Sequence, residues 1–141
     1  LLARQRPERL AGIVFIAPAP DFTEELMWPS WDQATQEKLM REGKVEFPSD
    51  YDDSVMVYTK KLYEDARKNL VFAAPLRIEV PVRILQGMAD DSVPWQHAAR
   101  LADYIDGDDV IMTIIKHADH RMSEPEDLAR LQQVLEVMPG L

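Results

Sequence analysis

Two clusters of ionisable residues in the second half of the sequence have the side chains for acid-base chemistry. The first runs from Gln86 to Trp95 and holds Asp90, and the second runs from Lys116 to Arg121 and holds His120. A carboxylate that faces an imidazole can hold the tautomer of the ring. It also stabilises the imidazolium that forms when the ring takes a proton from a nucleophile. Together the two clusters therefore favour nucleophilic catalysis.

Each cluster also has a simpler explanation when it is considered alone. Asp90 could be an ordinary turn residue or helix cap, and Asp91 or Ser92 could cap the helix that begins near Pro94. A single loop histidine is usually just hydrogen-bonded, and His97 falls inside a predicted helix where a surface or packing role suffices. Only the joint placement of the two clusters favours chemistry.

The clusters follow predicted strands. The runs Ile13–Ala17, Val80–Leu85 and Val110–Ile115 are short, apolar and rich in β-branched residues, which is typical of strands buried on both faces. The first cluster follows the second run, and the second cluster follows the third. Active groups in open α/β sheets lie beyond the carboxyl ends of the strands, so we expect Asp90 and His120 to meet at one edge of the sheet.

Helices are predicted between and after these strands. Apolar residues at helical spacing mark two of them, namely Ala98, Leu101, Ala102 and Ile105 in one, and Leu128, Leu131, Leu135 and Met138 in the other. The pattern Ser123-x-x-Glu126 is a capping box for the last helix. Strands that alternate with amphipathic helices predict an α/β fold with parallel strands, right-handed crossovers and flanking helices.

Residues 21–75 differ in residue pattern from the rest of the chain and are predicted to form a mostly helical insertion. Ser30-x-x-Gln33 is a capping-box pattern for a helix that Gly43 can end, and Thr59 can cap a helix that runs to about Asn69. Between them, residues 45–47 and 54–57 could pair as a hairpin. The predicted organisation is a helix end and a core strand in 1–20, the insertion in 21–75, and a second part of the core in 76–141.

Composition narrows the choice of partners. The chain has 16 basic and 25 acidic residues and a net charge of −9, which repels phosphate backbones and argues against nucleic-acid binding. Cysteine is absent, which fits a reducing compartment, so a cytoplasmic location is expected. No run approaches the roughly 18 apolar residues of a membrane span, so none is expected.

The spacing in these clusters resembles a known family. Gly87-x-x-Asp90-x-x-Val93-Pro94, with a histidine after the next strand, is similar to the closing half of the α/β-hydrolase family. The longer stretches Gln86–Trp95 and His117–Met122 resemble the ABHD10 group of serine hydrolases, which are depalmitoylating thioesterases and esterases. The resemblance implies that Asp90 rather than Asp91 is the acid, and that His120 rather than His117 is the base.

The resemblance also implies a nucleophile that these 141 residues lack. Members of the family carry a Gly-x-Ser-x-Gly elbow, and no such motif occurs here. The family pattern would place the elbow upstream, with Leu1–Arg6 as the tail of the helix that follows it. We therefore expect a fragment whose first partner is the missing N-terminal half of the same protein, and which is inactive alone.

The implied function is hydrolysis of carboxylic esters or thioesters through a Ser-Asp-His triad, with a small-molecule or acylated substrate and no cofactor. In this interpretation the insertion is a cap over the site. Its residues Met27, Trp28 and Trp31 could bind an acyl chain, or they could equally form the core of the cap itself.

Two other functions compete with hydrolysis. A hydrolase-like module without activity could serve in binding, and the residue at the upstream nucleophile position would decide between the two. Alternatively, several of the same side chains could hold a divalent ion, namely Asp90, Asp91, His117, Asp119 and His120. No two of these residues share a predicted helix at i, i+4 spacing, and hydrolysis already accounts for Asp90 and His120, so no metal site is predicted.

Overall fold

The computed structural model describes residues 2–49 and 53–138, which form two compact units. The first unit comprises residues 1–20 and 71–141, and the second comprises residues 21–70. The predicted insertion begins where the second unit begins, but residues 71–75 group with the first unit. In the ranges that the structure describes, no helix is long and apolar enough to cross a membrane.

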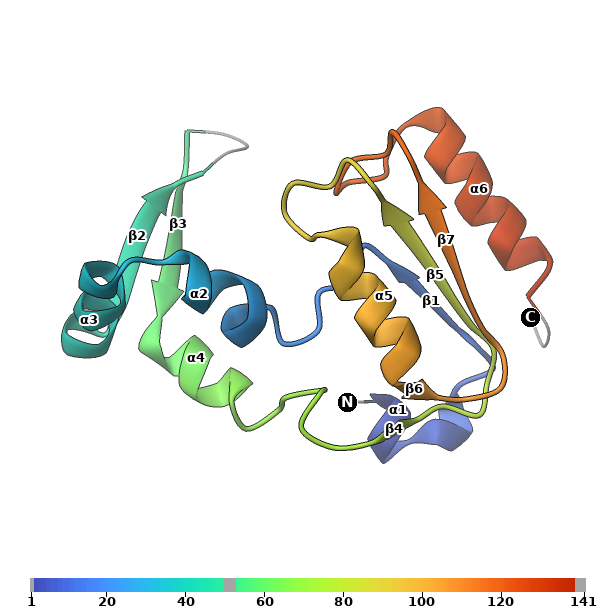
Figure 1. Ribbon diagram of the computed structural model, residues 1–141, viewed down its shortest axis with the longest axis horizontal. Coiled ribbons are helices and arrows are strands. Elements are labelled where there is room, and N and C mark those ends of the chain that lie inside the picture. The colour runs from blue at the N-terminus through green and yellow to red at the C-terminus, as the bar shows by residue number, and fades with distance from the viewer. Residues whose placement is uncertain (1, 50–52, 139–141) are drawn as a thin grey trace. The chain divides into compact units, whose positions relative to one another are not determined.

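A three-stranded parallel sheet forms the centre of the first unit (Figure 1). Its strands are β1 (Ile13–Ile16), β5 (Val82–Gly87) and β7 (Val110–Ile115), in the order β1-β5-β7. All three predicted strands and their parallel pairing are thereby confirmed. The register aligns the first residues of the strands, and β5 and β7 stay paired as far as Gly87 and Ile115.

Two helices cover opposite faces of this sheet. Val82 and Ile84 of β5 pack with Leu101 of α5 (Trp95–Tyr104), whereas Leu85 packs with Leu131 of α6 (Pro125–Glu136). Successive residues of a strand point to opposite faces, so the alternation along β5 assigns one helix to each face. The residues of β5 consequently form the best buried strand of the unit.

The helix starts differ from the predicted ones. The N-cap of α5 is Pro94, not Asp91 or Ser92. The backbone amide of Ser92 donates to the Asp90 side chain in the turn that precedes the helix. The N-cap of α6 is Glu124, not Ser123, and Pro125 occupies the first turn, where its fixed φ suits a helix.

The predicted buried face of α6 is only partly confirmed, because Leu131 packs against the core and Met138 is buried, but the other two residues are exposed. Leu128 is 53% exposed and Leu135 is 42% exposed, and the helix ends at Glu136, before Met138. The helix instead turns Leu131 and Val134 toward the cluster of Leu85, Ala118 and Met122. Apolar residues lie at helical spacing on two faces of α6, so the sequence pattern alone does not select the face that packs.

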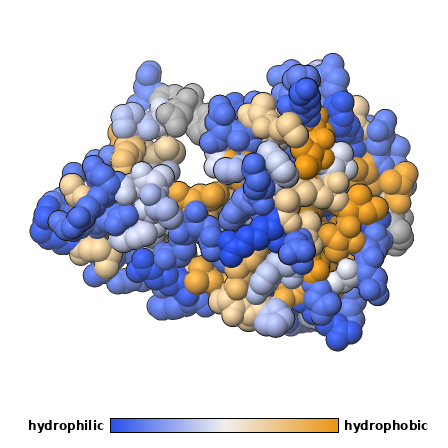
Figure 2. Space-filling view, in the orientation of Figure 1, coloured by the Kyte–Doolittle hydropathy of each residue, from blue (hydrophilic) through white to orange (hydrophobic). Residues whose placement is uncertain are grey.

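The outer strands are less buried than the sequence pattern predicts. Ile111 of β7 is 50% exposed and Ile16 of β1 is 43% exposed, although both strands had the composition of strands covered on both faces. Figure 2 shows hydrophobic residues at the surface of this unit. Within the described residues, β1 and β7 are the outer strands of the sheet, so each pairs with only one neighbour there.

Short elements complete the first unit. The helix α1 (Leu2–Gln5) stops before Pro7, as predicted, and Pro7 opens the 3-10 helix η1 (Pro7–Arg9). Leu1, which the prediction included in this helix, lies outside the described residues. The short strands β4 (Leu76–Arg77) and β6 (Ile105–Asp106) pair in parallel.

The second unit contains four helical segments and a hairpin. They are η2 (Thr23–Met27), α2 (Trp28–Ser30), α3 (Gln33–Glu42), β2 (Lys44–Pro48), β3 (Val55–Thr59) and α4 (Lys60–Ala66). The antiparallel pairing of β2 with β3 confirms the predicted hairpin. Leu39, Val45 and Tyr63 form the buried core of the unit.

The caps of the second unit are partly as predicted. Gly43 ends α3 with φ 82°, and the Thr59 side chain accepts the Leu62 amide at the start of α4. However, Asp32 rather than Ser30 caps α3, because its carboxylate accepts the Thr35 amide. The helix α4 also ends at Ala66, three residues earlier than predicted.

Gly87 provides a test of the close packing at the end of β5. A Cβ atom there would lie 2.2 Å from the backbone oxygen of Ala118, a distance that requires backbone movement. We expect Gly87→Ala to lower the free energy of unfolding, measured by urea denaturation, by about 1–3 kcal/mol. Gly12→Ala is the matched control and should cost less. Its Cβ would come too close to the flexible end of Met138, while the nearest backbone atom, the Pro81 oxygen, would lie at 3.4 Å, an ordinary contact distance. Equal losses in the two variants would contradict this account.

Candidate active site

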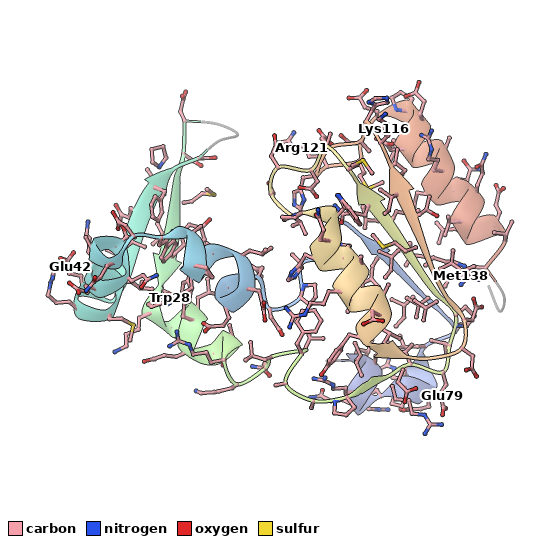
Figure 3. The ribbon with its side chains drawn as sticks, in the orientation of Figure 1. Trp28, Glu42, Glu79, Lys116, Arg121 and Met138 are labelled. Carbon is pink, nitrogen blue, oxygen red and sulfur yellow. The ribbon has the colours of Figure 1, made fainter. Side chains whose placement is uncertain are left out.

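The loops after β5 and β7 lie together at the carboxyl edge of the sheet. The Met88 amide donates to the Ile115 oxygen at 2.8 Å, and the Ala89 amide donates to the Ala118 oxygen at 3.1 Å. These bonds continue the strand pairing into the loops. Figure 3 places Lys116 and Arg121, the two ends of the second cluster, at this edge.

Asp90 and His120 come into direct contact there. The Nδ1 atom of His120 lies 3.0 Å from Oδ2 of Asp90, as the placement of the two clusters predicted. The Asp90 side chain has no exposed surface, whereas the His120 side chain is 39% exposed. A buried carboxylate therefore faces a ring that is partly exposed in this chain.

The Asp90 carboxylate accepts four hydrogen bonds. Its Oδ1 accepts the amides of Ser92 at 2.9 Å and Val93 at 2.7 Å, and its Oδ2 accepts the Gln86 side-chain amide at 3.0 Å as well as the His120 ring. An ionised carboxylate offers about four acceptor positions, so this set satisfies it.

Those hydrogen bonds keep Asp90 ionised in spite of its burial. Burial is the largest single influence and raises the pKa of the Asp90 carboxyl. The hydrogen bonds act in the opposite direction and together lower this pKa below its ordinary value, the donors being the Val93 amide, His120, Gln86 and the Ser92 amide. Because the ionised carboxylate only accepts, His120 Nδ1 carries the proton, and Nε2 of the neutral ring is the acceptor.

Two residues of this site have roles that the sequence did not predict, since Asp119 was considered only as a possible metal ligand. Gln86 was noted only as the start of a motif, although a polar residue that ends a buried apolar strand signals a buried hydrogen bond. Asp119 holds the base loop, because its Oδ1 accepts the amides of Arg121 and Met122 at 2.9 Å each. This turn places Met122 at φ 46°, an uncommon conformation for a residue other than glycine.

The alternative acid and base lie in other surroundings. Asp91 and His117 are both exposed. His117 lines a cavity of about 690 Å³ between the end of β7 and the start of α6, and His120 is not among the residues that line it. Among the candidates, Asp90 and His120 are therefore the pair that the fold brings together.

His97 has a packing role at the base of the insertion. Its ring is buried, and Nε2 lies 2.7 Å from the Pro20 oxygen, just before the second unit begins. Phe72, just after that unit ends, packs edge-on against His97 and Tyr104, and the Tyr104 hydroxyl donates to the Phe72 oxygen at 2.9 Å. Both ends of the insertion are therefore attached to one helix, α5.

The candidate acyl-binding residues lie within the insertion. Trp28 and Trp31 pack against its core, with ring centroids 5.5 and 5.4 Å from that of Tyr63. Met27 ends the segment η2 and is partly exposed. The two tryptophans contribute to the core of the second unit, and a role of any of the three in substrate binding stays a prediction.

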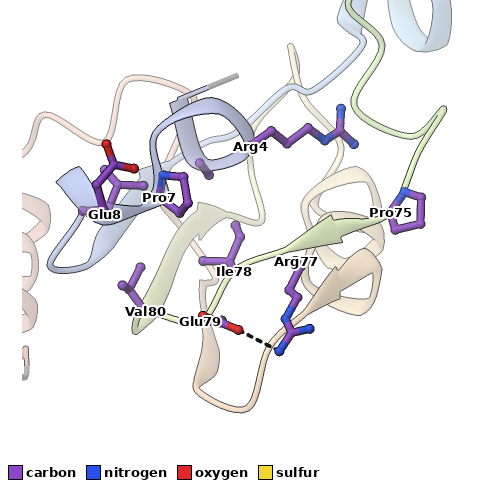
Figure 4. Close-up of a pocket in the computed structure, with 10 residues that line it drawn as sticks. Arg4, Pro7, Glu8, Pro75, Arg77, Ile78, Glu79 and Val80 are labelled. Atoms are coloured by element: carbon purple, nitrogen blue, oxygen red, sulfur yellow. Dashed lines mark ion pairs between the residues drawn. The ribbon is translucent and has the colours of Figure 1, made fainter.

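A larger cavity lies away from this chemistry. It has a volume of about 750 Å³, and its lining includes Leu10 and Val80, which precede β1 and β5 (Figure 4). This end of the strands is opposite the edge that carries Asp90 and His120. The ion pair of Arg77 with Glu79 beside it joins two exposed side chains. Among the described residues, no group of three or more His, Asp or Glu side chains could hold a metal ion.

Known proteins resemble this chain in sequence and in structure. The mitochondrial palmitoyl-protein thioesterase ABHD10 of Mus musculus is 31% identical over 124 residues, which cover 87% of this chain and 41% of that protein. The crystal structure of a putative hydrolase from Agrobacterium vitis matches 91% of this chain and 49% of the hydrolase chain, with 41% identity and a TM-score of 0.86. The structure of α/β-hydrolase domain-containing protein 10 from mouse matches 95% of this chain and 54% of its own, with 29% identity and a TM-score of 0.83.

These matches concern part of each relative. The chain spans about two fifths of the length of the curated relatives and about half of the solved chains. No family model matches the chain. The parallel sheet and its flanking helices correspond to part of the α/β-hydrolase structures, in agreement with the predicted fold class. The chain therefore forms part of an α/β-hydrolase fold related to that of the ABHD10 palmitoyl-protein thioesterases.

Proposed function

We propose that the complete protein containing this chain is a serine hydrolase that cleaves carboxylic esters or thioesters, with Asp90 as the acid and His120 as the base. The observation that carries the proposal is the 3.0 Å contact between His120 Nδ1 and the buried Asp90 carboxylate. The names of the curated relatives support an S-acylated protein as substrate. The nucleophile would come from a Gly-x-Ser-x-Gly elbow outside these 141 residues.

In this mechanism Asp90 stays ionised and holds His120 with the proton on Nδ1. Nε2 then takes the proton of the serine hydroxyl as its oxygen attacks the acyl carbon, and passes that proton to the departing thiolate or alkoxide. An acyl-enzyme results. Nε2 next takes a proton from water as the water oxygen attacks the acyl carbon. It returns that proton to the serine oxygen as the bond between the acyl carbon and serine breaks, which releases the carboxylic acid and regenerates the serine. The ionised Asp90 stabilises the imidazolium in both steps.

The insertion supplies the proposed acyl-binding surface. Met27, Trp28 and Trp31 are its candidate residues, since apolar and aromatic side chains line most sites for apolar ligands. The cytoplasmic location inferred from the absence of cysteine also stays a prediction.

Replacement of the histidines tests the assignment of the base. In the complete protein, we expect His120→Ala to lower kcat/KM for a short p-nitrophenyl ester by roughly 10⁴-fold or more, because no other group takes the serine proton. His117→Ala is the matched control from the same loop and should change kcat/KM only modestly. Comparable losses in both variants would show that the base is wrongly assigned. A wild-type protein that binds acyl compounds without hydrolysing them would favour a binding module instead.

The ionised Asp90 also predicts how stability depends on pH. At pH 7 we expect Asp90→Asn to lower the free energy of unfolding of the complete protein by about 1–3 kcal/mol, because an amide cannot accept from all four donors. The pKa of Asp90 is lowered on folding, so its contribution is fully present above about pH 4, the range of an unfolded aspartate, and is lost as the pH falls through the folded-state pKa.

Urea denaturation between pH 3 and pH 8 measures this dependence. The difference between wild type and Asp90→Asn should shrink toward the acid end of the range. The exposed neighbour provides the control, since Asp91→Asn should stay close to wild type throughout. A difference for Asp90→Asn that is constant with pH would mean that the carboxylate is not ionised in the folded protein.

A further inference from the structure

Gln86 is a fully buried polar residue near the end of the strand that leads into the loop of Asp90. It lies in β5 and has no exposed surface. Its amide nitrogen donates to the Asp90 Oδ2 atom at 3.0 Å, to the Gly87 oxygen at 3.0 Å and to the Val93 oxygen at 3.2 Å. One amide group therefore reaches the acid and the backbone on both sides of it.

The neighbours of this amide determine its orientation. All three groups at the nitrogen end are acceptors, so a flipped amide would place its oxygen against a carboxylate and two carbonyl oxygens. At the other end, Oε1 of Gln86 is buried and has no hydrogen-bond partner among the residues that the structure describes. An unpaired buried carbonyl destabilises a fold, so the hydrogen bonds at the nitrogen end must account for a glutamine at this position.

Of these hydrogen bonds, the one to Asp90 affects the candidate site directly. The amides of Ser92 and Val93 hold Oδ1 of the carboxylate, and Gln86 holds Oδ2, the oxygen that faces His120. With both oxygens fixed, the carboxylate cannot rotate away from the ring. Gln86 and His120 are the two side chains that donate to Oδ2 among the described residues, so without Gln86 only the His120 ring would hold this oxygen.

We infer that Gln86 is a positioning residue, which locks the Asp90 carboxylate so that Oδ2 keeps the Nδ1–H of His120 and leaves Nε2 as the base. The inference rests on the proposed hydrolase function for its effect on catalysis. Its geometric content, the orientation of Asp90 and the tautomer of His120, is independent of that function.

Removal of the amide tests the inference in the complete protein. We expect Gln86→Met to lower kcat for a p-nitrophenyl ester roughly 10- to 100-fold with little change in KM. The melting temperature should also fall, because the buried Asp90 carboxylate and the carbonyls of Gly87 and Val93 lose a donor. Gln132→Met is the matched control, because Gln132 donates a similar amide bond to Glu136 on the exposed face of α6. It should retain wild-type kcat. A Gln86→Met variant with wild-type kcat would overturn the inference.

A second variant keeps the shape of the side chain but makes its ability to donate a hydrogen bond depend on pH. In Gln86→Glu, a protonated carboxyl at low pH can still donate to Asp90, whereas at high pH two carboxylates repel each other. We expect the ratio of kcat/KM for Gln86→Glu to that of wild type to fall as the pH rises. A ratio that does not change with pH would indicate a purely structural role and would contradict the inference.

NMR separates this inference from the proposed function. The ¹⁵N shifts of the His120 ring should show the Nδ1–H tautomer in wild type and a mixture of tautomers in Gln86→Met. If wild type hydrolyses no ester, the proposed function fails, and the tautomer comparison still decides the role of Gln86. An unchanged tautomer in Gln86→Met would refute that role whether or not the protein is an enzyme.

Discussion

The need to satisfy one buried, ionised carboxylate governs the geometry of this end of the sheet. The Asp90 side chain has no exposed surface, so protein donors must replace the water that would otherwise solvate it. Those donors come from the end of β5, from the turn that follows it and from the loop after β7. The arrangement of these three segments thus follows from the burial of one carboxylate.

Close backbone approach at Gly87 makes this arrangement possible. The carbonyl of Ala118 lies where any side chain on Gly87 would have to be, so the two loops can run against each other. The backbone bonds from Met88 to Ile115 and from Ala89 to Ala118 extend the parallel pairing beyond the strands. The distance between acid and base is therefore set by main-chain packing, which is more rigid than contact between long side chains.

The sequence predicts the sheet well because its signal is local. The run Val110–Ile115 is mostly apolar and β-branched, and this local composition favours a strand whatever its neighbours are. The order of strands and helices then allows only a few topologies. The helix starts and the buried face of α6 are less predictable, since each depends on competition with tertiary contacts, such as the packing of Leu131 rather than Leu128. The contact of Asp90 with His120 follows from topology. The part played by Gln86 does not, because it depends on which atoms a buried amide can reach.

The way the insertion is attached has a consequence for how this fold can diversify. Pro20 is bonded to His97, and Phe72 is held by Tyr104, so the chain leaves and re-enters the first unit at two points fixed on one helix. Between these points, residues 21–70 have a core of their own around Tyr63. A segment with its own core and fixed ends can change in length and composition without disturbing the acid and the base. Residues 21–70 can thus diverge while the contact between Asp90 and His120 stays constant.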